Sequence, residues 1–591
     1  MSEKKDEINM QGDKASAMNT LKKVLRFIGK YRLLLFVSIL LACLTVVLTL
    51  YVPILFGDAI DGIIGKGKVQ FSTVSYYGGR IIVLIAITAL LTWIMNAINN
   101  RLTYSVVRDI RSTAIEHIQK LPLSWLDGHS TGDLVDRVIA DADQLSDGLL
   151  LGFSQLFSGI VTIVVTLFFM FSKSLEVTLM VIILTPVSFF VAKFISTHSY
   201  QMFRKQTETR GIQTALIDEM IGNEKTVKAF YHEKEASESF RKINEQLQDY
   251  SWKAVFFSSL TNPSTRAVNA VIYALVALLG AHMILIGNLT VGGLSVLLNY
   301  ANQYMKPFND ISSVITELQN ALACAARIFA LIEAPEQSED PQKELGNVKG
   351  QIDIENVFFS YTPDKPLIEH FDLHAKAGTR IAIVGPTGCG KTTFINLLMR
   401  FYDIDDGTIM IDGTDIQTVS RHSLRRNYGM VLQDTWLKSG TVRENITFGK
   451  PDASDEEIIT AAKKAHSWEF IRRLPKGLDT EINDDSLSQG QRQLLCITRV
   501  MLLDPPMLIL DEATSSIDTR TEQLIQQAFD ALMEGKTSFV VAHRLSTIRN
   551  ADEILVMRDG KIIEQGNHES LMAENGFYTH LYNSQFADVS E

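Results

Sequence analysis

One short segment of the sequence combines glycines, a lysine and a threonine at the spacing of a phosphate-binding loop. Residues 385–392 read Gly-Pro-Thr-Gly-Cys-Gly-Lys-Thr, between the apolar run Ile381–Val384 and the helical stretch Thr393–Arg400. Glycines let backbone N–H groups curl around phosphate oxygens, and the start of the next helix adds partial positive charge. This strand–loop–helix context predicts a site for nucleotide phosphates, where Lys391 reaches the β- and γ-phosphates and Thr392 holds Mg²⁺. The residues expected to contact the nucleotide here are Gly385, Pro386, Thr387, Gly388, Cys389, Gly390, Lys391, Thr392 and Thr393.

A second apolar run, Met507–Leu510, is followed by two adjacent carboxylates, Asp511 and Glu512. Side chains alternate along a strand, so the two carboxylates point in different directions. We therefore expect Asp511 to meet the Mg²⁺ shell and Glu512 to face the attacking water, within the hydrogen-bond reach that a general base needs. Alone this pair is weak evidence, because many strands end in Asp-Glu. Beside the phosphate loop it is strong.

Two further patterns fit the same chemistry. The run Ser538–His543 is a buried-type strand that ends in a histidine, and in a phosphate-loop domain we interpret His543 as a contact to the γ-phosphate. Leu487–Gln493 opens a helix that begins near Gln491, where Ser488 and Gly490 are typical of a phosphate contact at a helix start. A simple helix cap by Ser488 is the alternative.

The elements that must position these residues belong to an α/β domain. Residues 334–350 are rich in Pro, Gln, Glu and Asp and poor in apolar side chains, which is typical of a linker. After them, short β-rich runs alternate with helical ones. We therefore assign residues 351–591 to one nucleotide-binding domain.

The first half of the chain has a different organisation, dominated by long apolar runs. Crossing a bilayer takes about 20 apolar residues, because the core is about 30 Å thick and each helical residue rises about 1.5 Å. Residues 33–333 are therefore predicted to form an all-α transmembrane domain of six helices, after a cytoplasmic segment 1–32. The six stretches are Leu33–Phe56, Ile81–Ile98, Leu149–Met170, Leu175–Ile195, Val268–Ile286 and Val291 to about Asn309.

The sixth stretch is interrupted by Asn299, Asn302, Gln303 and Lys306. Polar side chains at membrane depth are costly unless they face protein or water. The helix is therefore either an ordinary bundle helix with a satisfied polar face or the lining of a substrate path. The sequence does not decide between these two.

Basic residues set the orientation of these helices. They concentrate in the N-terminus and in the loops Asn99–Asp147 and Ser196–Arg266, which the positive-inside rule places in the cytoplasm together with the nucleotide-binding domain. The protein is thus expected in the cytoplasmic membrane, as a multi-pass protein. Within the loops, long helices should project from the membrane, joined by short turns such as Leu126–Asp133, with Pro122 and Pro263 near helix ends.

Composition excludes some classes. The net charge of −11 argues against a nucleic-acid partner, which would need a basic face. The polar, charged start of the chain and the length of its first apolar run argue against a signal peptide. The cysteines share no metal-ligand spacing and are interpreted as buried or incidental thiols: Cys43, Cys324, Cys389 and Cys496.

These motifs, in this order, resemble those of the ATP-binding-cassette superfamily, and six membrane helices before one cassette resemble an exporter-type half-transporter. The resemblance implies ATP and Mg²⁺ as ligands and a site shared across a dimer of cassettes. It implies that Tyr361 stacks on adenine and that Gln433 contacts Mg²⁺ and water. It also implies that Ser515–Asp518 links the two ATP sites, and that Leu126–Asp133 and Gly211–Thr226 dock on cassettes.

One motif departs from the family pattern. The signature is usually Leu-Ser-Gly-Gly-Gln, and here Gln489 replaces a glycine that permits close backbone approach to the γ-phosphate. The preceding Thr480–Ser486 is also short and lacks glycines. The signature contacts are thus expected from Ser488, Gln489, Gly490 and Gln491, beside intact catalytic residues Lys391, Asp511, Glu512 and His543. This asymmetry resembles one subunit of heterodimeric bacterial exporters, whose partner supplies an intact signature and a degenerate catalytic site.

The resulting expectation is ATP-driven export of amphipathic or lipophilic small molecules, with multidrug export favoured. A lipid or lipopeptide flippase and a homodimeric exporter stay open, because they use the same machinery. A peptide exporter is disfavoured by the lack of a protease-like domain before the helices. A nucleotide-gated channel or regulator is disfavoured by Glu512, a soluble ATPase by the apolar runs, and an importer by the fusion of membrane and ATPase parts in one chain.

Overall fold

The structure is a computed structural model in which the chain forms two compact units. A helical unit comprises Met1–Gln119 and Thr131–Ala334, and an α/β unit comprises Lys120–Ser130 and Pro335–Glu591. Residues described here are 18–63, 69–362, 365–432, 435–483, 486–511, 517–541 and 545–586.

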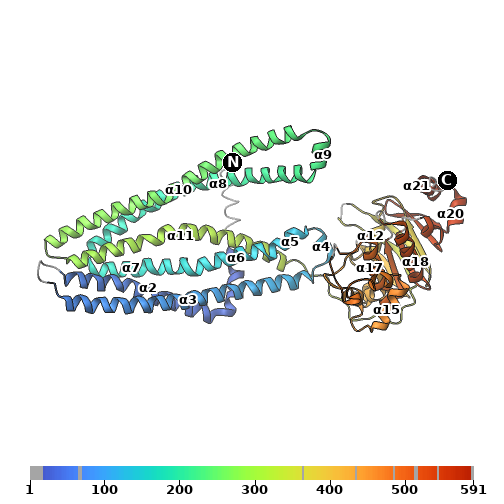
Figure 1. Cartoon of the computed structure of the whole chain (residues 1–591), viewed down its shortest axis with the longest axis horizontal. Coiled ribbons are helices and arrows are strands. Elements are labelled where there is room, and N and C mark those ends of the chain that lie inside the picture. The colour runs from blue at the N-terminus through green and yellow to red at the C-terminus, as the bar shows by residue number, and fades with distance from the viewer. Residues whose placement is uncertain are drawn as a thin grey trace. The chain divides into compact units, whose positions relative to one another are not determined.

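The helical unit is built from long helices with short connections (Figure 1). Its main helices are α2 (Arg32–Asp61), α3 (Phe71–Ile118), α5 (Thr131–Val138), α6 (Ala140–Leu151), α7 (Phe157–Lys173), α8 (Leu175–Gly222), α9 (Glu224–Ala229), α10 (Glu233–Leu285) and α11 (Val291–Ile332). A π-helical turn, Gly152–Leu156, joins α6 to α7. Figure 1 shows α8 and α10 running side by side to the short α9.

Each of the six predicted apolar stretches falls within helical segments of this unit, apart from Ile286, the residue that follows α10. Within the described residues, four helical segments are long and apolar enough to cross a membrane: Met18–Asp61, Phe71–Ile118, Thr131–Lys173 and Glu233–Leu285. The start of α8, Leu175–Val187, is apolar but shorter. The membrane-spanning character of the unit is therefore supported, and the count of six crossings stays a prediction.

The predicted projecting helices continue directly from the apolar stretches. Helices α3 and α8 run unbroken to Ile118 and Gly222. Two details of the predicted projecting helices were wrong. Pro263 lies inside α10 and not near its end, since neighbouring groups in such bundles can satisfy the carbonyl that a proline leaves without a donor. Leu126–Asp133 is not a single turn, because it contains the end of α4 (Leu123–Asp127) and the start of α5.

The α/β unit contains two main sheets. The four-stranded sheet has the order β2-β1-β4-β5, and the six-stranded sheet has the order β12-β11-β3-β10-β9-β6. The strands are β1 (Ile352–Phe359), β2 (Ile368–Ala375), β3 (Arg380–Val384), β4 (Asp406–Ile411), β5 (Thr414–Asp415), β6 (Tyr428–Val431), β9 (Met507–Asp511), β10 (Thr537–Val541), β11 (Glu553–Arg558) and β12 (Lys561–Gly566). A small pair, β7 (Gly440–Thr441) and β8 (Glu481–Ile482), lies apart.

Helices cover both faces of the six-stranded sheet. The helices of this unit after α4 are α12 (Lys391–Leu398), α13 (Arg421–Arg426), α14 (Val442–Ile446), α15 (Asp455–Lys464), α16 (Trp468–Ile471), α17 (Gln489–Leu503), α18 (Thr519–Met533), α19 (Leu545–Arg549), α20 (His568–Glu574) and α21 (Phe577–Phe586). In β9, Ile509 packs into one hydrophobic core with Phe394 of α12, whereas Leu510 packs into another with Phe529 of α18. The alternation explains the apolar run before Asp511, because a central parallel strand is buried on both faces.

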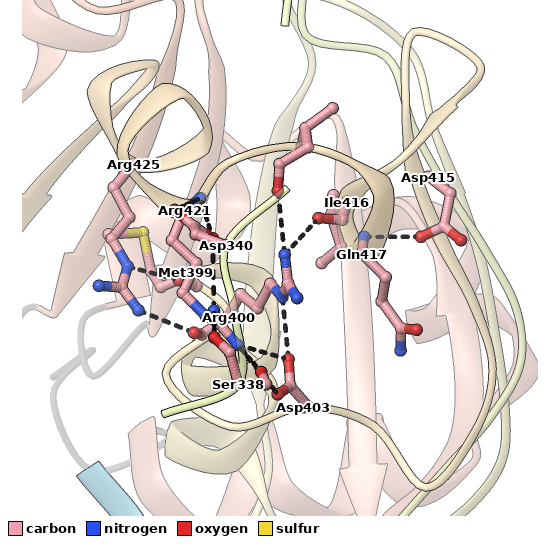
Figure 2. Close-up of polar contacts among 11 residues, drawn as sticks. Ser338, Asp340, Met399, Arg400, Asp403, Asp415, Ile416, Gln417, Arg421 and Arg425 are labelled. Atoms are coloured by element: carbon pink, nitrogen blue, oxygen red, sulfur yellow. Dashed lines mark hydrogen bonds and ion pairs between the residues drawn. The ribbon is translucent and has the colours of Figure 1, made fainter. Parts of the chain in front are cut away.

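The segment 334–350 contains no helix or strand, and it is anchored on the α/β unit by one arginine. Figure 2 shows Arg421 among Ser338, Asp340 and Asp403. Its guanidinium is buried and donates to the Ser338 carbonyl at 3.0 Å and to the Asp403 carboxylate at 3.1 Å. The Asp340 carboxylate in turn accepts the Arg421 backbone N–H at 2.9 Å.

Candidate nucleotide-binding site

The six-stranded sheet brings the predicted site segments to one edge. Strands β3, β10, β9 and β6 are mutually parallel, with β10 between β3 and β9. Carboxyl ends of parallel strands meet at the same edge of a sheet, which is where ligands bind in such folds. The phosphate loop follows β3, Asp511 ends β9, and the segments holding Gln433 and His543 follow β6 and β10 in the sequence.

The loop between β3 and α12 has the conformation that its glycines allow. Gly388 and Gly390 have φ of +83° and +104°, in the region that favours glycine. A Cβ on Gly385 would lie 2.2 Å from the Met557 carbonyl oxygen, so a larger residue does not fit there. The loop therefore turns tightly and directs the chain into the N-terminus of α12.

The charge at this loop is positive. Lys391 is the first residue of α12, and its ammonium donates to the carbonyl oxygens of Gly385 at 2.7 Å and Pro386 at 3.1 Å. Thr392 follows, exposed, in the first helical turn. A helix N-terminus with a lysine over the loop attracts anions. The cradle thus fits a phosphate chain, and the exposed hydroxyl-bearing side chain of Thr392 follows Lys391 in the same helical turn.

Tyr361 is brought next to the same helix. Its hydroxyl lies 3.1 Å from the Thr393 hydroxyl, and its ring contacts Tyr402 edge-on at a centroid distance of 5.0 Å. The residue is 48% exposed. An exposed ring beside the phosphate-loop helix is suited to stacking on a base, and a core position for Tyr361 is excluded.

Asp511 is paired in register with Val541 of β10, which in turn is paired with Ile383 of β3. Adjacent strands lie about 4.8 Å apart, so the backbone of Asp511 lies about 10 Å from β3. This is a span that a metal ion and phosphate groups can bridge. Three predicted catalytic residues lie outside the described residues, and their roles stay predictions: Gln433, Glu512 and His543.

The predicted signature segment opens α17. The Ser488 hydroxyl accepts the Gln491 backbone N–H, and the Gln491 side chain accepts the Ser488 N–H, forming a capping box. The helix cap that the sequence left as an alternative for Ser488 is therefore real. A phosphate contact by Ser488 stays a prediction.

Gln489 carries no backbone cost in this structure. It is the first residue of α17, and its φ is not positive. The right-handed helical backbone at this position therefore does not by itself require glycine, and a poorer approach to the γ-phosphate stays a prediction. Only the bulk of the Gln489 side chain stays as a difference from glycine.

Asp518 lies at the other end of the loop that follows β9. It caps α18 by accepting the Thr521 backbone N–H at 3.0 Å, and this hydrogen bond holds the pKa of Asp518 below its ordinary value. Asp518 is thus ionised at neutral pH and positioned by α18. Ser515 and Ser516, predicted in the same linking loop, lie outside the described residues.

The two predicted docking segments have different settings. The first includes α4, which belongs to the α/β unit, where the Tyr402 hydroxyl donates to the Asp127 carboxylate. The second spans the end of α8 and the start of α9, followed by Phe230 and Tyr231, which are 79% and 85% exposed. Large exposed aromatic side chains at such a tip indicate an interaction surface.

Sequence reasoning missed Tyr402 and the polar side chains of α3 that line a cavity in the helical unit. No local pattern marks Tyr402, because its role depends on a contact with a residue far away in the chain. Thr88, Thr92 and Asn96, by contrast, recur every fourth residue within a predicted span, and that spacing could have been noticed.

Comparisons with known proteins agree with this geometry. Residues 35–308 match the family described as ABC transporter transmembrane region, and residues 368–515 match the family described as ABC transporter. The chain is 40% identical over 528 residues to the fatty acid ABC transporter ATP-binding/permease protein of Mycobacterium bovis, covering 88% of this chain and 84% of that one. It is 33% identical to the putative multidrug export ATP-binding/permease protein YgaD of Bacillus subtilis, covering 96% of this chain and 100% of that one.

A solved structure gives the same result for the fold. The structure of a bacterial Atm1-family ABC exporter with ATP bound superimposes with a TM-score of 0.77 at 29% identity. The match covers 95% of this chain and 99% of that one. The likeness therefore extends over both units.

Proposed function

The chain belongs to the ABC transporter family, as a half-transporter of exporter type whose ATPase activity is coupled to transport, and we propose that it exports amphipathic or lipophilic small molecules across the cytoplasmic membrane. We place its N-terminus and ATPase domain in the cytoplasm. The observation that supports the ATPase assignment is the sheet edge shared by the phosphate loop and Asp511, with the exposed Tyr361 ring beside the helix that follows the loop.

The proposed reaction is hydrolysis of ATP to ADP and phosphate by in-line attack of water. Tyr361 stacks on adenine, and the loop N–H groups with Lys391 hold the phosphates. Glu512 orients or deprotonates the water, and His543 contacts the γ-phosphate. Catalysis of this kind is mostly positioning plus electrostatic stabilisation.

Mg²⁺ is the proposed metal, with Thr392, Asp511 and Gln433 as its ligands or as partners of its bound waters. When bound, it would offset charge on the phosphate oxygens. Transport follows if ATP binds better to the closed arrangement of two cassettes than to the open one, because only such a difference can shift the equilibrium.

The partner we propose is a second, different half-transporter with an intact signature and a degenerate catalytic site. Gln489 adds a side chain at the position where the family has glycine, while Lys391 and Asp511 are intact. The exposed Phe230 and Tyr231 support docking on a partner. The measurement that decides is ATPase activity of this chain purified with no partner. Substrate-stimulated turnover in the homodimer would refute the heterodimer and favour the homodimeric exporter.

Similarity to these relatives does not identify the transported molecule. The two relatives described above are named for a fatty acid and for multidrug export. Multidrug export is our first proposal, and a lipid or lipopeptide flippase is the second. A nucleotide-gated channel is disfavoured, because a gate that does not turn over ATP has no need of Glu512.

Two substitutions test the ATPase proposal. Glu512→Gln should keep ATP binding and lower hydrolysis about hundredfold or more, as the loss of a general base does. Lys391→Ala should weaken nucleotide binding itself. Both are measured on the full chain with its co-purified partner in lipid vesicles, with a fluorescent nucleotide for binding and phosphate release for hydrolysis. Near-normal turnover of Glu512→Gln would show that Glu512 is not the base.

A further inference from the structure

The helical unit contains a cavity of about 820 Å³ between α2, α3 and α11, which we call the α2–α3–α11 cavity. Its volume falls within the range of small-molecule sites, roughly 300–1,000 Å³. On α3 its lining runs from Ile85 to Asn96 along one helix face, which is a strip about 16 Å long at about 1.5 Å per residue. Such a strip accommodates an extended aliphatic chain or a drug-sized molecule.

Of the twelve described residues that line the cavity, six are apolar and six are polar but uncharged. The apolar part includes Phe56, Ile85 and Trp93. The polar side chains are Thr49, Thr88, Thr92, Asn96, Asn299 and Gln303. A site with both kinds of side chain favours an amphipathic ligand, whose apolar part is removed from water and whose polar groups find partners.

The hydrogen bonds of the threonines show what they offer to a ligand. The hydroxyls of Thr49, Thr88 and Thr92 each donate to the backbone carbonyl four residues earlier, all at 2.8 Å. Their single hydrogen is therefore used, and their oxygens are acceptors. Ligand hydroxyl or amide N–H groups are the matching donors.

The amide side chains complete the set. Asn299 donates one N–H to the Ser295 carbonyl at 3.0 Å, which leaves its own carbonyl oxygen as an acceptor. Asn96 and Gln303 each present an amide with donors and an acceptor. The cavity can thus satisfy a ligand that has both donors and acceptors, such as a hydroxylated or amide-containing molecule.

None of the described residues that line the cavity is Lys, Arg, His, Asp or Glu. A carboxylate, phosphate or ammonium placed here gains no counter-charge from these residues, whereas an uncharged hydroxyl or amide group finds hydrogen-bond partners among them. The first charged residue after the lining on α11 is Lys306, three residues beyond Gln303 and on the same side of the helix. Lys306 therefore suggests a competing hypothesis, in which its ammonium binds an anionic head group next to the cavity.

We propose that the α2–α3–α11 cavity binds the transported molecule and selects uncharged amphiphiles that carry hydroxyl or amide groups. This proposal rests on the export function proposed above. It separates the chain from a transporter of fatty acid anions, despite the name of the Mycobacterium bovis relative.

The test compares dansyl-labelled undecanoic acid with its N-hydroxyethyl amide, which replaces the charged carboxylate by the uncharged amide and hydroxyl groups that we expect the cavity to recognise. Binding to the purified full chain in nanodiscs is followed by energy transfer from tryptophan to dansyl, since Trp93 lines the cavity. We expect the neutral amide to bind about tenfold more tightly or better, a difference of about 1.4 kcal/mol. Equal or tighter binding of the acid would overturn the proposal.

Variants locate the selectivity. Replacing Thr92 by valine together with Asn96 by leucine keeps side-chain size and should remove most of the preference for the amide, whereas Lys306→Gln should leave it unchanged. If Lys306→Gln abolishes binding of the probes, the hypothesis of an anionic head group bound by Lys306 is correct and our proposal is wrong. Asn96→Asp should create about tenfold tighter binding of the cationic N-aminoethyl amide. Misfolding cannot produce that gain, so its absence counts against the site.

These measurements test the proposed binding site and the proposed export function independently. Probe binding requires neither ATP nor a partner. If the neutral probe binds as expected but ATP never drives its transport into vesicles, the export function fails and the site stands. If ATP drives transport and the acid is transported in preference to the amide, the export function is supported and the proposed selectivity for uncharged molecules is wrong.

Discussion

Gly490 is the signature residue whose identity the packing of this chain explains. A Cβ at this position would lie 2.4 Å from the Thr521 side chain and 3.2 Å from Ile517, at the start of α18. Real Cβ contacts are not that short, so α17 and α18 would have to separate. Gln489, one residue earlier, is the first residue of α17 and has no positive φ, so its backbone does not require glycine.

The first prediction follows at this scale. Gly490→Ala should cost about 1–3 kcal/mol of packing and lower ATPase activity about tenfold, because α18 also carries Asp518. Gln489→Gly is the matched control and should not lower activity. Phosphate release from the full chain with its co-purified partner is the measurement. If Gly490→Ala is as active as the parent, close packing of α17 on α18 is not needed for turnover.

At the residue scale, the sequence predicted well where a motif is local. The phosphate loop needs only contiguous residues, and its strand, glycine turn and helix lie where the pattern places them. The sequence could not show whether the backbone angle at Gln489 requires glycine, because a sequence pattern does not reveal backbone angles. It also missed Tyr402, whose contact with Asp127 joins positions 275 residues apart.

At the scale of the elements, the linker 334–350 is held on the α/β unit by the buried guanidinium of Arg421. Only 5% of the Arg421 side chain is exposed, and it holds the linker through Ser338 and Asp340 while also pairing with Asp403. Arg400, two residues after the end of α12, also donates to Asp403, at 2.9 Å (Figure 2). Burial alone would raise the pKa of Asp403, but hydrogen bonds and charge from Arg400 and Arg421 outweigh it and lower that pKa.

The second prediction concerns this cluster. Arg421→Ala should destabilise the α/β unit by about 2–3 kcal/mol, less than a fully buried pair because the carboxylates are half exposed. That corresponds to a lower melting temperature by roughly 5–10 °C. Arg421→Lys should recover only part of the loss, because it cannot form the forked contacts. Scanning fluorimetry of the full chain is the measurement, and an unchanged melting temperature would contradict the prediction.

The same cluster predicts a pH dependence. Because the folded pKa of Asp403 lies below its unfolded value of about 3.9, its contribution to stability is present above that value and is lost as pH falls through the folded pKa. The stability difference between the parent and Arg421→Ala should therefore stay constant from neutral pH to about pH 5 and shrink below about pH 4. A difference that shrinks already at pH 6 would point to another group.

A third prediction concerns the crossing of α2 and α11. A Cβ on Gly292 would lie 2.1 Å from the Gly57 carbonyl oxygen and 2.7 Å from the Asp61 carboxylate, which accepts the Gly292 N–H. Gly292→Ala should therefore push the two helices apart and destabilise the helical unit by about 1–3 kcal/mol. Gly78→Ala on α3 is the control, because nothing lies within 4 Å of its Cβ. Equal melting temperatures for the two variants would show that the close crossing is not required.

Elements were easier to predict than their ends. Apolar runs placed every long helix of the first unit, because burial in lipid or protein needs length and hydrophobicity, which the sequence displays. Their continuation past the apolar stretch, and the place of Pro263 inside α10, depend on tertiary packing that supports the helix beyond what propensity indicates.

For the whole molecule, coupling requires the α/β unit to act on the helices. The segment Lys120–Ser130 belongs to the α/β unit, although the chain on both sides of it, α3 and α5, belongs to the helical unit. Because this segment is covalently joined to α3 on one side and to α5 on the other, a movement of the α/β unit also moves the ends of these two helices. Within the α/β unit, the Tyr402 hydroxyl holds this segment by donating to Asp127. Burial and this hydrogen bond raise the pKa of Tyr402, so its hydroxyl is a donor at any physiological pH.

The last prediction tests that link. Tyr402→Phe keeps the ring beside Tyr361 but removes the hydroxyl, so ATP affinity and basal hydrolysis should stay within about twofold of the parent. The substrate-stimulated part of the ATPase activity should fall about threefold to tenfold, which corresponds to about 0.7–1.4 kcal/mol, the net contribution of one ordinary hydrogen bond. Asp127→Ala should give the same loss, and the double variant should add nothing to it, because both remove one interaction. Additive losses in the double variant would mean that Tyr402 and Asp127 act separately, and that α4 is held to the α/β unit by other contacts.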